Sequence, residues 1–417
     1  MLGQIRGNAR TCVFIEPLFV IPSSMYTTYA SVYMLKLNVT DTELGLVTTL
    51  NLLLQIFSAF ISGYLTDRMG RRKALWVFDV VSWSLGTLLW AISQNFWWFV
   101  LAAFLNSFQR IPSTAWYCLL VEDTEPDKRT IVFTGLQIVS VVGGLFAPIG
   151  GILVSHFSLV PATRIMYAFA CISMSLMIYF RHLGLHETDI GLRKMKERNK
   201  AHFQEELVEY WTVLKQILKD RTLMLLFAVY VLWNVQTTIR TTFVSVYQVE
   251  YLHIPAALIS LFPAISSIAM VALLFAAMPR FREEQAKGLM NVGFLCLIAA
   301  NAVLVWTPKG NFSWVVVSTI LAAIGTIIAN PYVESVVANA IDDEHRATML
   351  SVLNVLILAF TSPAGIIGGW TYSIDPRIPL WLVIAVFILC VALVWLAGTK
   401  GNRMEKAVER ADSQVEA

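Results

Sequence analysis

The sequence predicts an all-α membrane protein of twelve transmembrane helices, because of its composition, the length of its apolar runs and its division into two halves. Of 417 residues, 57% are hydrophobic and 14% are charged, and the mean hydropathy is +0.65. A soluble domain carries about a quarter charged residues, so this chain has too little polar surface to cover itself in water. Its apolar runs of about 20 residues or more match the ~30 Å hydrocarbon core of a bilayer.

Six apolar runs precede a long polar stretch, and six follow it. We place the spans at 12–35, 44–66, 74–94, 97–121, 131–155 and 162–181, and then at 223–247, 256–278, 287–306, 313–340, 347–370 and 378–398. Each should be helical, because lipid offers backbone groups no water to bond. The chain thus divides into an N-terminal six-helix bundle (1–182), a linker (183–221), a C-terminal six-helix bundle (222–398) and a cytoplasmic tail (399–417).

Apolar residues recur at helical spacing among the charges of the linker. They are Leu207, Tyr210, Trp211, Leu214, Ile217 and Leu218. This spacing predicts an amphipathic helix, which either lies along the cytoplasmic membrane interface or is solvated between the bundles. We favour the solvated helix.

Basic residues indicate which side of the membrane holds the termini. If both termini are cytoplasmic, the outer loops and their edges hold only Lys36, Arg164, Lys309 and Arg377, whereas the inner loops and the tail are rich in Lys and Arg. Cytoplasmic loops carry the excess of basic residues in membrane proteins. We therefore expect a multi-pass protein of the cell membrane with both termini inside, and the short loops favour a bacterial inner membrane.

The loop between the second and third spans carries the most specific pattern in the chain. It reads Gly63-Tyr64-Leu65-Thr66-Asp67-Arg68-Met69-Gly70-Arg71-Arg72-Lys73. This loop resembles the motif of the major facilitator superfamily, Gly-x-Leu-Ser/Thr-Asp-Arg-x-Gly-Arg-Arg/Lys, at every defined position. The twelve spans, the central linker and a weak sequence repeat between the two halves extend the resemblance to essentially the whole chain. It implies a transporter built from two six-helix pseudo-repeats around a central cavity.

The residue types in this loop suggest what each position does. Gly63 should let another helix approach closely, and Gly70 should permit a tight turn. Asp67 can accept hydrogen bonds from a helix N-terminus or from an arginine. The resemblance implies that Asp67 latches the cytoplasmic side while the halves rock; alternatively, the basic residues only fix the topology. The proposed conformational gate comprises Gly63, Asp67, Arg68, Gly70, Arg71 and Arg72.

Two patterns typical of the superfamily's multidrug antiporters are imperfect here. Their fourth helix carries Arg-x-x-Gln-Gly, but alignment on Gln109 puts Asn106 at the arginine position, with Arg110 one turn later. Their fifth helix carries Gly-x-x-x-Gly-Pro-x-x-Gly-Gly, whereas residues 143–151 read Gly-Gly-Leu-Phe-Ala-Pro-Ile-Gly-Gly. The eleventh span repeats such residues at Pro363, Gly365, Gly368 and Gly369. These glycines predict close helix crossings, and the proline predicts a bend.

Five ionisable residues lie within the predicted spans, away from their edges: Glu16, Asp79, Arg110, Arg240 and Glu334. Such groups are costly in lipid and usually face a cavity or a partner. Four lie on spans 1, 4, 7 and 10, which line the central cavity in the superfamily that the chain resembles. Arg110 and Arg240 can pair with a carboxylate of the protein or of an anionic substrate, and Glu16 or Glu334 can carry a coupling proton. Alternatively, Glu16 and Arg110 form a static pair, and interfacial water surrounds Glu334. We expect Asp79 to be a structural partner of the basic loop.

Aromatic residues on the same four spans are candidates for an apolar pocket wall. They are Tyr26, Tyr29, Trp116, Tyr117, Tyr230, Trp233 and Tyr332, and we select Tyr29, Trp116 and Trp233. Most aromatic residues of a membrane protein belong to packing or to the interfacial belts, so we expect only two or three of the seven to line a pocket.

The sequence lacks the residue patterns that metal binding, catalysis and nucleic-acid binding require. The five cysteines show no metal-ligand spacing, and no catalytic cluster or Walker loop is present, so we expect neither an enzyme nor a cofactor. No basic tract with interleaved aromatics suggests nucleic acid.

The remaining interpretation is a secondary transporter, which we expect to be a monomer that exports a small molecule by alternating access, coupled to protons. An ion-coupled importer of a small organic solute, anionic if Arg110 and Arg240 bind it, is the first alternative. A non-transporting sensor on the same fold is a remote one.

Overall fold

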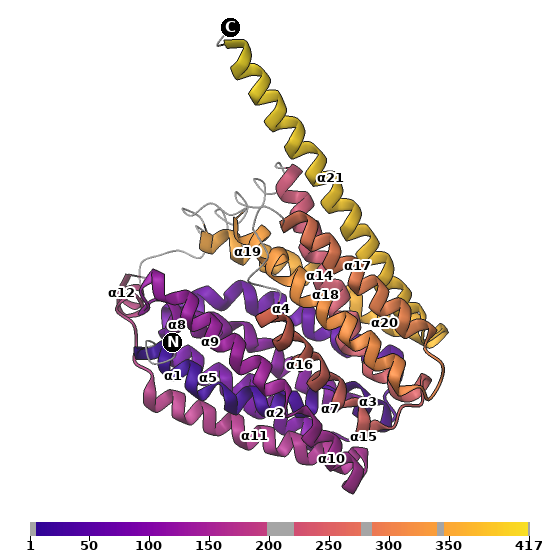
Figure 1. Cartoon of the computed structure of the whole chain (residues 1–417). Coiled ribbons are helices and arrows are strands. Elements are labelled where there is room, and N and C mark those ends of the chain that lie inside the picture. The colour runs from indigo at the N-terminus through magenta and orange to yellow at the C-terminus, as the bar shows by residue number, and fades with distance from the viewer. Residues whose placement is uncertain (1–5, 198–220, 277–285, 340–345, 416–417) are drawn as a thin grey trace.

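A computed structural model describes residues 6–197, 221–276, 286–339 and 346–415. Within these ranges, the side chains of residues 126–130, 197, 221–223, 226, 274–276, 286–287, 331–332, 334–339, 346–353 and 397–415 are not described. Every regular element of the described chain is a helix. The predicted all-α fold class is therefore confirmed (Figure 1).

The first six predicted spans are helical, several of them in pieces. The first consists of α1 (Gly7–Ile15), α2 (Pro17–Thr27) and α3 (Ala30–Lys36), the second of α4 (Asp41–Met69), and the third of α5 (Arg71–Asp79), the π-helical turn η2 (Val80–Leu85) and α6 (Gly86–Ile92). The fourth consists of α7 (Phe96–Asn106), the 3-10 turn η3 (Ser107–Gln109) and α8 (Arg110–Val121), the fifth of α9 (Pro126–Gly144) and α10 (Ala147–Phe157), and the sixth of α11 (Leu159–Gly184). A short helix, α12 (Asp189–Glu197), begins the linker.

The second group follows the same plan. The seventh span consists of α14 (Arg221–Val246) and the π-helical turn η4 (Tyr247–Tyr251), and the eighth of α15 (Ala256–Ile259) and α16 (Leu261–Ala276). The remaining spans are α17 (Ala286–Trp306), α18 (Phe312–Asn339), α19 (Arg346–Thr361) with α20 (Pro363–Ile374), and α21 (Ile378–Val415). Helix α21 continues through most of the predicted tail.

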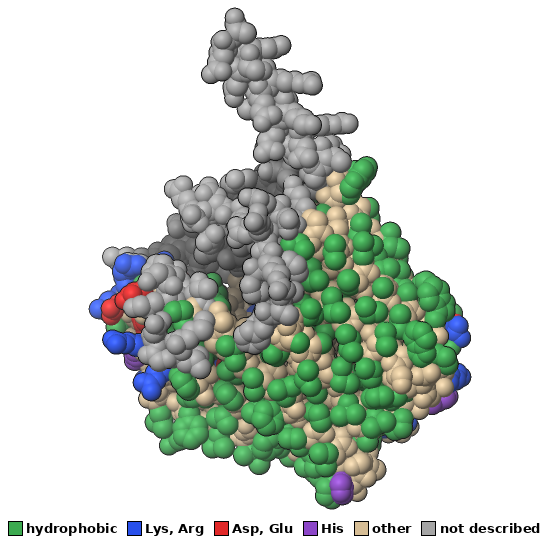
Figure 2. Space-filling view, viewed as in Figure 1, with side chains coloured by type: hydrophobic (Ala, Val, Ile, Leu, Met, Phe, Trp, Pro, Cys, Tyr) green, Lys and Arg blue, Asp and Glu red, His purple; other side chains and the backbone are tan. Residues whose placement is uncertain are grey.

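Nine helices of the described chain are long and apolar enough to cross a membrane. The first, fourth and seventh predicted spans are helical but fall outside these limits of length and composition; the fourth carries Asn106, Gln109 and Arg110 in its middle. The structure is thus consistent with the predicted twelve spans. Hydrophobic side chains cover most of the described face in Figure 2, as a lipid-facing surface requires.

The halves meet where helices cross at glycines. Gly45 on α4 packs against Gly365 on α20, where an added Cβ at Gly365 would lie 2.7 Å from the Gly45 carbonyl oxygen. At a second crossing, Gly151 on α10 packs against the Ala257 carbonyl on α15. The predicted close crossings in the fifth and eleventh spans are therefore confirmed, and the two crossings relate the halves as a repeat would.

Helix breaks accompany these crossings. Helix α9 ends at Gly144, and α10 resumes at Ala147 with Pro148 in its first turn, which confirms the predicted bend. In the eleventh span, α19 ends at Thr361 and α20 starts at Pro363.

Each half has two ends. We call the end that carries residues 63–73 the loop end, and the opposite end, where α3, α10 and α15 gather in Figure 1, the closed end.

Candidate functional site

The loop between α4 and α5 turns at Gly70. Its φ of 85° and ψ of 151° lie in a region that essentially only glycine adopts, so the predicted tight turn is confirmed. Gly63 differs, because no described atom beyond its own helix and chain neighbours lies within 4 Å of an added Cβ. The expected close helix approach at Gly63 therefore stays a prediction.

The N-terminus of α5 binds the carboxylate of Glu187. Oε1 accepts the Arg71 backbone N–H at 2.9 Å, and Oε2 accepts that of Arg72 at 3.0 Å. These are N–H groups that a helix start leaves unpaired, and the carboxylate also faces the positive end of the helix dipole. Sequence reasoning misses this contact, because Glu187 belongs to the linker and lies 116 residues from Arg71. The start of the linker is thereby fixed to the N-terminal half.

The Arg71 side chain joins the loop to α8. Its guanidinium lies 2.9 Å from Oδ1 of Asp67 and 3.2 Å from Oε1 of Glu122, and only 4% of the side chain is exposed. Glu122 also accepts a hydrogen bond from the Thr188 hydroxyl. Asp67 thus pairs with an arginine, as predicted, and this pair lies within the N-terminal half. Its role as a latch stays a prediction.

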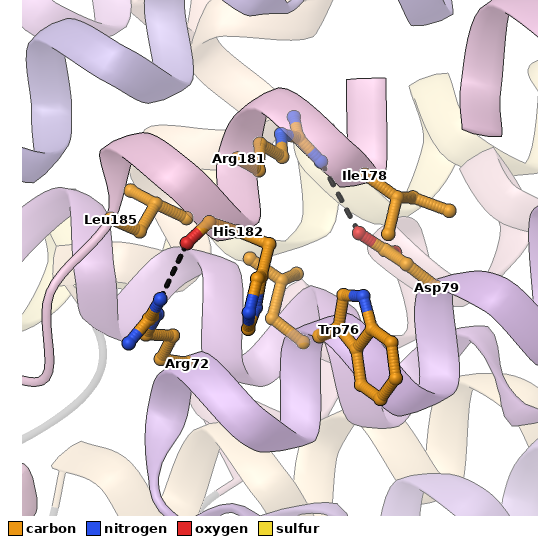
Figure 3. Close-up of a pocket in the computed structure, with 8 residues that line it drawn as sticks. Arg72, Trp76, Asp79, Ile178, Arg181, His182 and Leu185 are labelled. Carbon is orange, nitrogen blue, oxygen red and sulfur yellow. Dashed lines mark hydrogen bonds and ion pairs between the residues drawn. The ribbon is translucent and has the colours of Figure 1, made fainter. Parts of the chain in front are cut away.

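A second charge cluster lies inside the N-terminal half, where Arg181 on α11 binds two carboxylates. Its guanidinium donates to Glu16, between α1 and α2, at 2.5 Å, and lies 3.4 Å from Oδ2 of Asp79 at the end of α5. Figure 3 shows Arg181 extending toward Asp79. The side chains of Arg181, Glu16 and Asp79 are 7%, 14% and 4% exposed. Because a buried unpaired charge costs several kcal/mol, this pairing stabilises the crossing of α2, α5 and α11.

These contacts correct two expectations. Glu16 pairs with Arg181 and not with Arg110, and the described partner of Asp79 is Arg181 and not the basic loop. Sequence reasoning misses Arg181 because the predicted span ends there, whereas α11 continues to Gly184. The pocket beside Arg181 in Figure 3 has a volume of about 10 Å³, which is space for about one water, so it is no substrate site.

Arg110 takes part in a polar network of the N-terminal half. Its Nε donates to Oε1 of Gln55 at 2.8 Å, and Gln55 donates in turn to Asn51 at 2.6 Å. Trp116, farther along α8, lies with its ring centroid 6.0 Å from Cζ of Arg181. In this conformation, both predicted cavity residues therefore make contacts within one half.

Arg240 lines a cavity of about 330 Å³ among α14, α16, α17 and α18. Thr27 and Thr28 reach the same cavity from the break between α2 and α3, so both halves contribute to it. Its volume lies in the range of small-molecule sites. This is where a predicted cavity residue and a cavity of ligand size coincide.

Two predicted wall residues are buried in packing instead. Tyr29 is 0% exposed, and its ring lies against Gly150 of α10. The ring centroid of Trp233 lies 6.1 Å from that of Phe294 and 6.2 Å from that of Phe387, in the core of the C-terminal half. Neither ring lines the cavity at Arg240 in this conformation, because residue type and span number do not say which face of a helix a ring occupies. Their roles as wall residues stay predictions.

Some predicted residues lie outside the described part of the structure. Helix α18 contains Tyr332 and Glu334, but their side chains are not described, and the predicted linker helix around 207–218 is outside the described residues. Tyr26 packs on Tyr167, with ring centroids 4.4 Å apart, and Tyr117 is 51% exposed on the surface of α8.

At the closed end, Lys36 and Glu250 join the halves. Nζ of Lys36 lies 2.9 Å from Oε1 of Glu250, and it is the one ion pair between the halves within the described chain. The side chains are 48% and 40% exposed, so the pair is worth about 0–1 kcal/mol. A cavity of about 320 Å³ lies beside it, lined in part by Asp41 and Tyr372.

A buried bridge from Thr49 is the more substantial connection. The Thr49 hydroxyl, on α4, donates to the Ser362 carbonyl at 2.8 Å and accepts from the Ile366 N–H at 2.8 Å. In an uninterrupted helix, residue 366 would donate directly to the carbonyl of residue 362. The Thr49 hydroxyl thus replaces a backbone hydrogen bond at the break before Pro363. Through it, α4 of the N-terminal half is linked to the eleventh span of the C-terminal half.

Comparisons with known proteins agree with this arrangement. The family model described as Major Facilitator Superfamily matches residues 18–360. No curated protein sequence matches the chain.

Several solved structures share the fold. A mutant of the nucleoside transporter NupG has a TM-score of 0.74 at 14% identity, covering 94% of this chain and 100% of that one. The human organic anion transporter MFSD10 (TETRAN) has a TM-score of 0.63 at 14% identity, covering 93% and 100%. A POT family transporter in complex with 5-aminolevulinic acid has a TM-score of 0.68 at 14% identity, covering 93% and 94%. At such low identity these likenesses show the fold alone.

Proposed function

Because the chain belongs to the Major Facilitator Superfamily, we propose that it is a secondary active transporter that carries a small molecule by alternating access. The observation that carries this proposal is the cavity at Arg240, which receives residues from both halves. A ligand in such a cavity contacts two bodies that move against each other. Parallel six-helix repeats with a site between them are a known transporter architecture. The Thr49 bridge and the Lys36–Glu250 pair would then have to break for the closed end to open.

The coupling ion is proposed to be a proton, carried by Glu16. Glu16 and Asp79 share the single guanidinium of Arg181. Protonation of Glu16 would leave Arg181 to Asp79 alone, which changes the contacts between α2, α5 and α11. Asp67 is proposed to act as the latch at the loop end, where its contacts would break and reform as the halves rock.

Export is the proposed direction, supported by the loop motif and by the glycine pattern of the fifth span. The alternative is import of a small organic solute, which Arg240 favours if that solute is an anion. We also propose that the protein is a monomer of the cell membrane, most consistent with a bacterial inner membrane, with both termini in the cytoplasm. This orientation puts the loop end inside, in agreement with the basic residues at 68 and 71–73.

A flux assay in liposomes tests the proposal. A panel of small solutes would be offered to reconstituted protein under an imposed pH gradient, for wild type beside Asp67→Asn and Glu16→Gln. We expect at least one solute to move protons in wild type and to fail in both variants, while Lys36→Gln, which removes a half-exposed pair, stays close to wild type. Solute movement that ignores the gradient would reject proton coupling. Binding without any flux would favour a sensor.

A further inference from the structure

The cavity at Arg240 combines one cation with an uncharged wall of mixed polar and apolar residues. Arg240 is the one charged side chain among the described residues that line it. Its Nε is shielded from solvent and has no hydrogen-bond partner within the described structure. Other interior arginines have at least one described partner. The Nε of Arg181 is also unpartnered, but its two Nη atoms bind Glu16 and Asp79, and Arg110 binds Gln55.

An unpartnered guanidinium is expensive at this depth. Arg240 lies 11 residues before Tyr251, which places it about 16 Å from the end of the span at the closed end. A charge inside the membrane needs a partner or water, and the described protein supplies no carboxylate to Arg240. We infer that the cavity binds a small organic anion with a single negative charge, and that this anion is the partner of Arg240.

The charge balance favours a carboxylate over a phosphate ester. One guanidinium neutralises one charge and grips a carboxylate through two parallel hydrogen bonds. A phosphate monoester carries about −1.5 to −2 at neutral pH, which would leave excess charge in a cavity with no second described cation. A monocarboxylate leaves no excess.

The rest of the wall indicates a hydroxylated body for the ligand. The hydroxyl of Thr241 donates to the Thr237 carbonyl, and that of Ser318 donates to the Ala300 carbonyl, so the oxygens of both remain acceptors. Asn301 likewise uses its amide N–H on the Leu297 carbonyl and keeps its oxygen. These acceptors suit a ligand that donates, such as a hydroxy acid. Phe262 is the only aromatic residue among the described lining, so no pair of rings is present to sandwich a flat base.

This inference rests on the proposed transport function, which makes the anion the transported substrate. A binding assay nevertheless tests it without any transport. Purified protein in detergent would be melted with hydroxy-monocarboxylates of three to seven carbons, gluconate among them. Each acid would be matched with its neutral amide and with the corresponding dicarboxylate. We expect at least one monocarboxylate to raise the melting temperature of wild type, with its amide and dicarboxylate giving smaller shifts.

Two variants separate binding from folding. Arg240→Gln should weaken binding of that acid by about 10- to 150-fold, as expected for loss of a charged hydrogen-bonded pair. Thr241→Phe keeps Arg240 but fills the cavity, and it should also abolish the shift. Equal stabilisation by amide and acid, unchanged binding in Arg240→Gln, or no response to any acid would overturn the inference. Because no gradient is involved, such a failure leaves the transport proposal standing, and absent flux in liposomes would leave a positive binding result intact.

Discussion

Thr49 offers a direct test of what holds the two halves together. Its hydroxyl makes two hydrogen bonds to the interrupted eleventh span, with Ser362 and Ile366, each at 2.8 Å. Thr49→Val keeps nearly the same volume but removes both bonds, so a buried carbonyl and a buried N–H lose their partner. Thr49→Ser keeps the hydroxyl and is the matched control.

The expected size of the effect follows from the number of bonds. Hydrogen bonds between transmembrane helices are worth about 0.6 kcal/mol on average and at most about 1.7, so the two together contribute roughly 1–3 kcal/mol. If they exist only while the closed end is shut, their loss favours opening by about 5- to 150-fold. An open population of about 1% in wild type would become roughly 5–60% in Thr49→Val.

Electron–electron distances between spin labels measure this opening. Ser155 on α10 and Ser373 on α20 are exposed near the closed end, one in each half, and can carry the labels through introduced cysteines. We expect a second, longer distance in Thr49→Val but not in Thr49→Ser. The parent protein, with its five native cysteines, reports background labelling. An unchanged distance distribution in a Thr49→Val protein that melts like wild type would refute the role of the bridge.

Two other substitutions test the N-terminal half by thermal melting. Gly70→Ala should lower the free energy of unfolding by about 1–3 kcal/mol, because its backbone conformation suits only glycine. The control is Gly63→Ala, where no described atom outside its own helix lies within 4 Å of an added Cβ. It should be neutral or stabilising by up to about 1 kcal/mol, and equal losses would contradict this reasoning. Arg181→Gln leaves two buried carboxylates without their cation and should cost about 3–5 kcal/mol. Adding Glu16→Gln should restore part of that loss, and a double variant no more stable than the single one would argue against the pairing.

The spans could be predicted from the sequence because a bilayer demands long apolar helices. The interruptions could not, except where proline and glycine mark them, as at Pro148 and Pro363. The break at Thr28 has neither residue beside it, and the π-helical turn at Val80–Leu85 has a glycine only at its end, Gly86. Such breaks depend on distant partners: Thr49, which completes the break at Pro363, lies 313 residues before Ser362.

The candidate site was predictable in its chemistry but not in its pairing. Their positions inside apolar runs predict that Glu16, Asp79 and Arg240 are costly in lipid. In the structure, Glu16 and Asp79 share one arginine, whereas Arg240 faces a cavity. Arg181, the partner of Glu16 and Asp79, lies at the predicted end of a span. Basic residues are common at such ends, so the sequence does not mark Arg181 as a buried partner. Glu187 is hidden for a different reason, because a linker carboxylate gives no sign of the helix that it caps.

Arg181 and Arg240 differ in whether the described structure provides a partner for the guanidinium. Arg181 is balanced within one half by Glu16 and Asp79, so it stabilises the body that contains it while that body moves as a unit. Arg240 faces the cavity, and no hydrogen bond or ion pair of its guanidinium is present within the described structure. A buried charge without a partner costs folding free energy, and a bound anion would remove that cost. Arg240→Gln should therefore melt at or above the wild-type temperature without ligand, whereas Arg181→Gln should melt well below it. This opposite sign is the signature of a binding residue held at the expense of stability. If both variants melted equally low, Arg240 would have a structural partner, and its assignment to the ligand would fail.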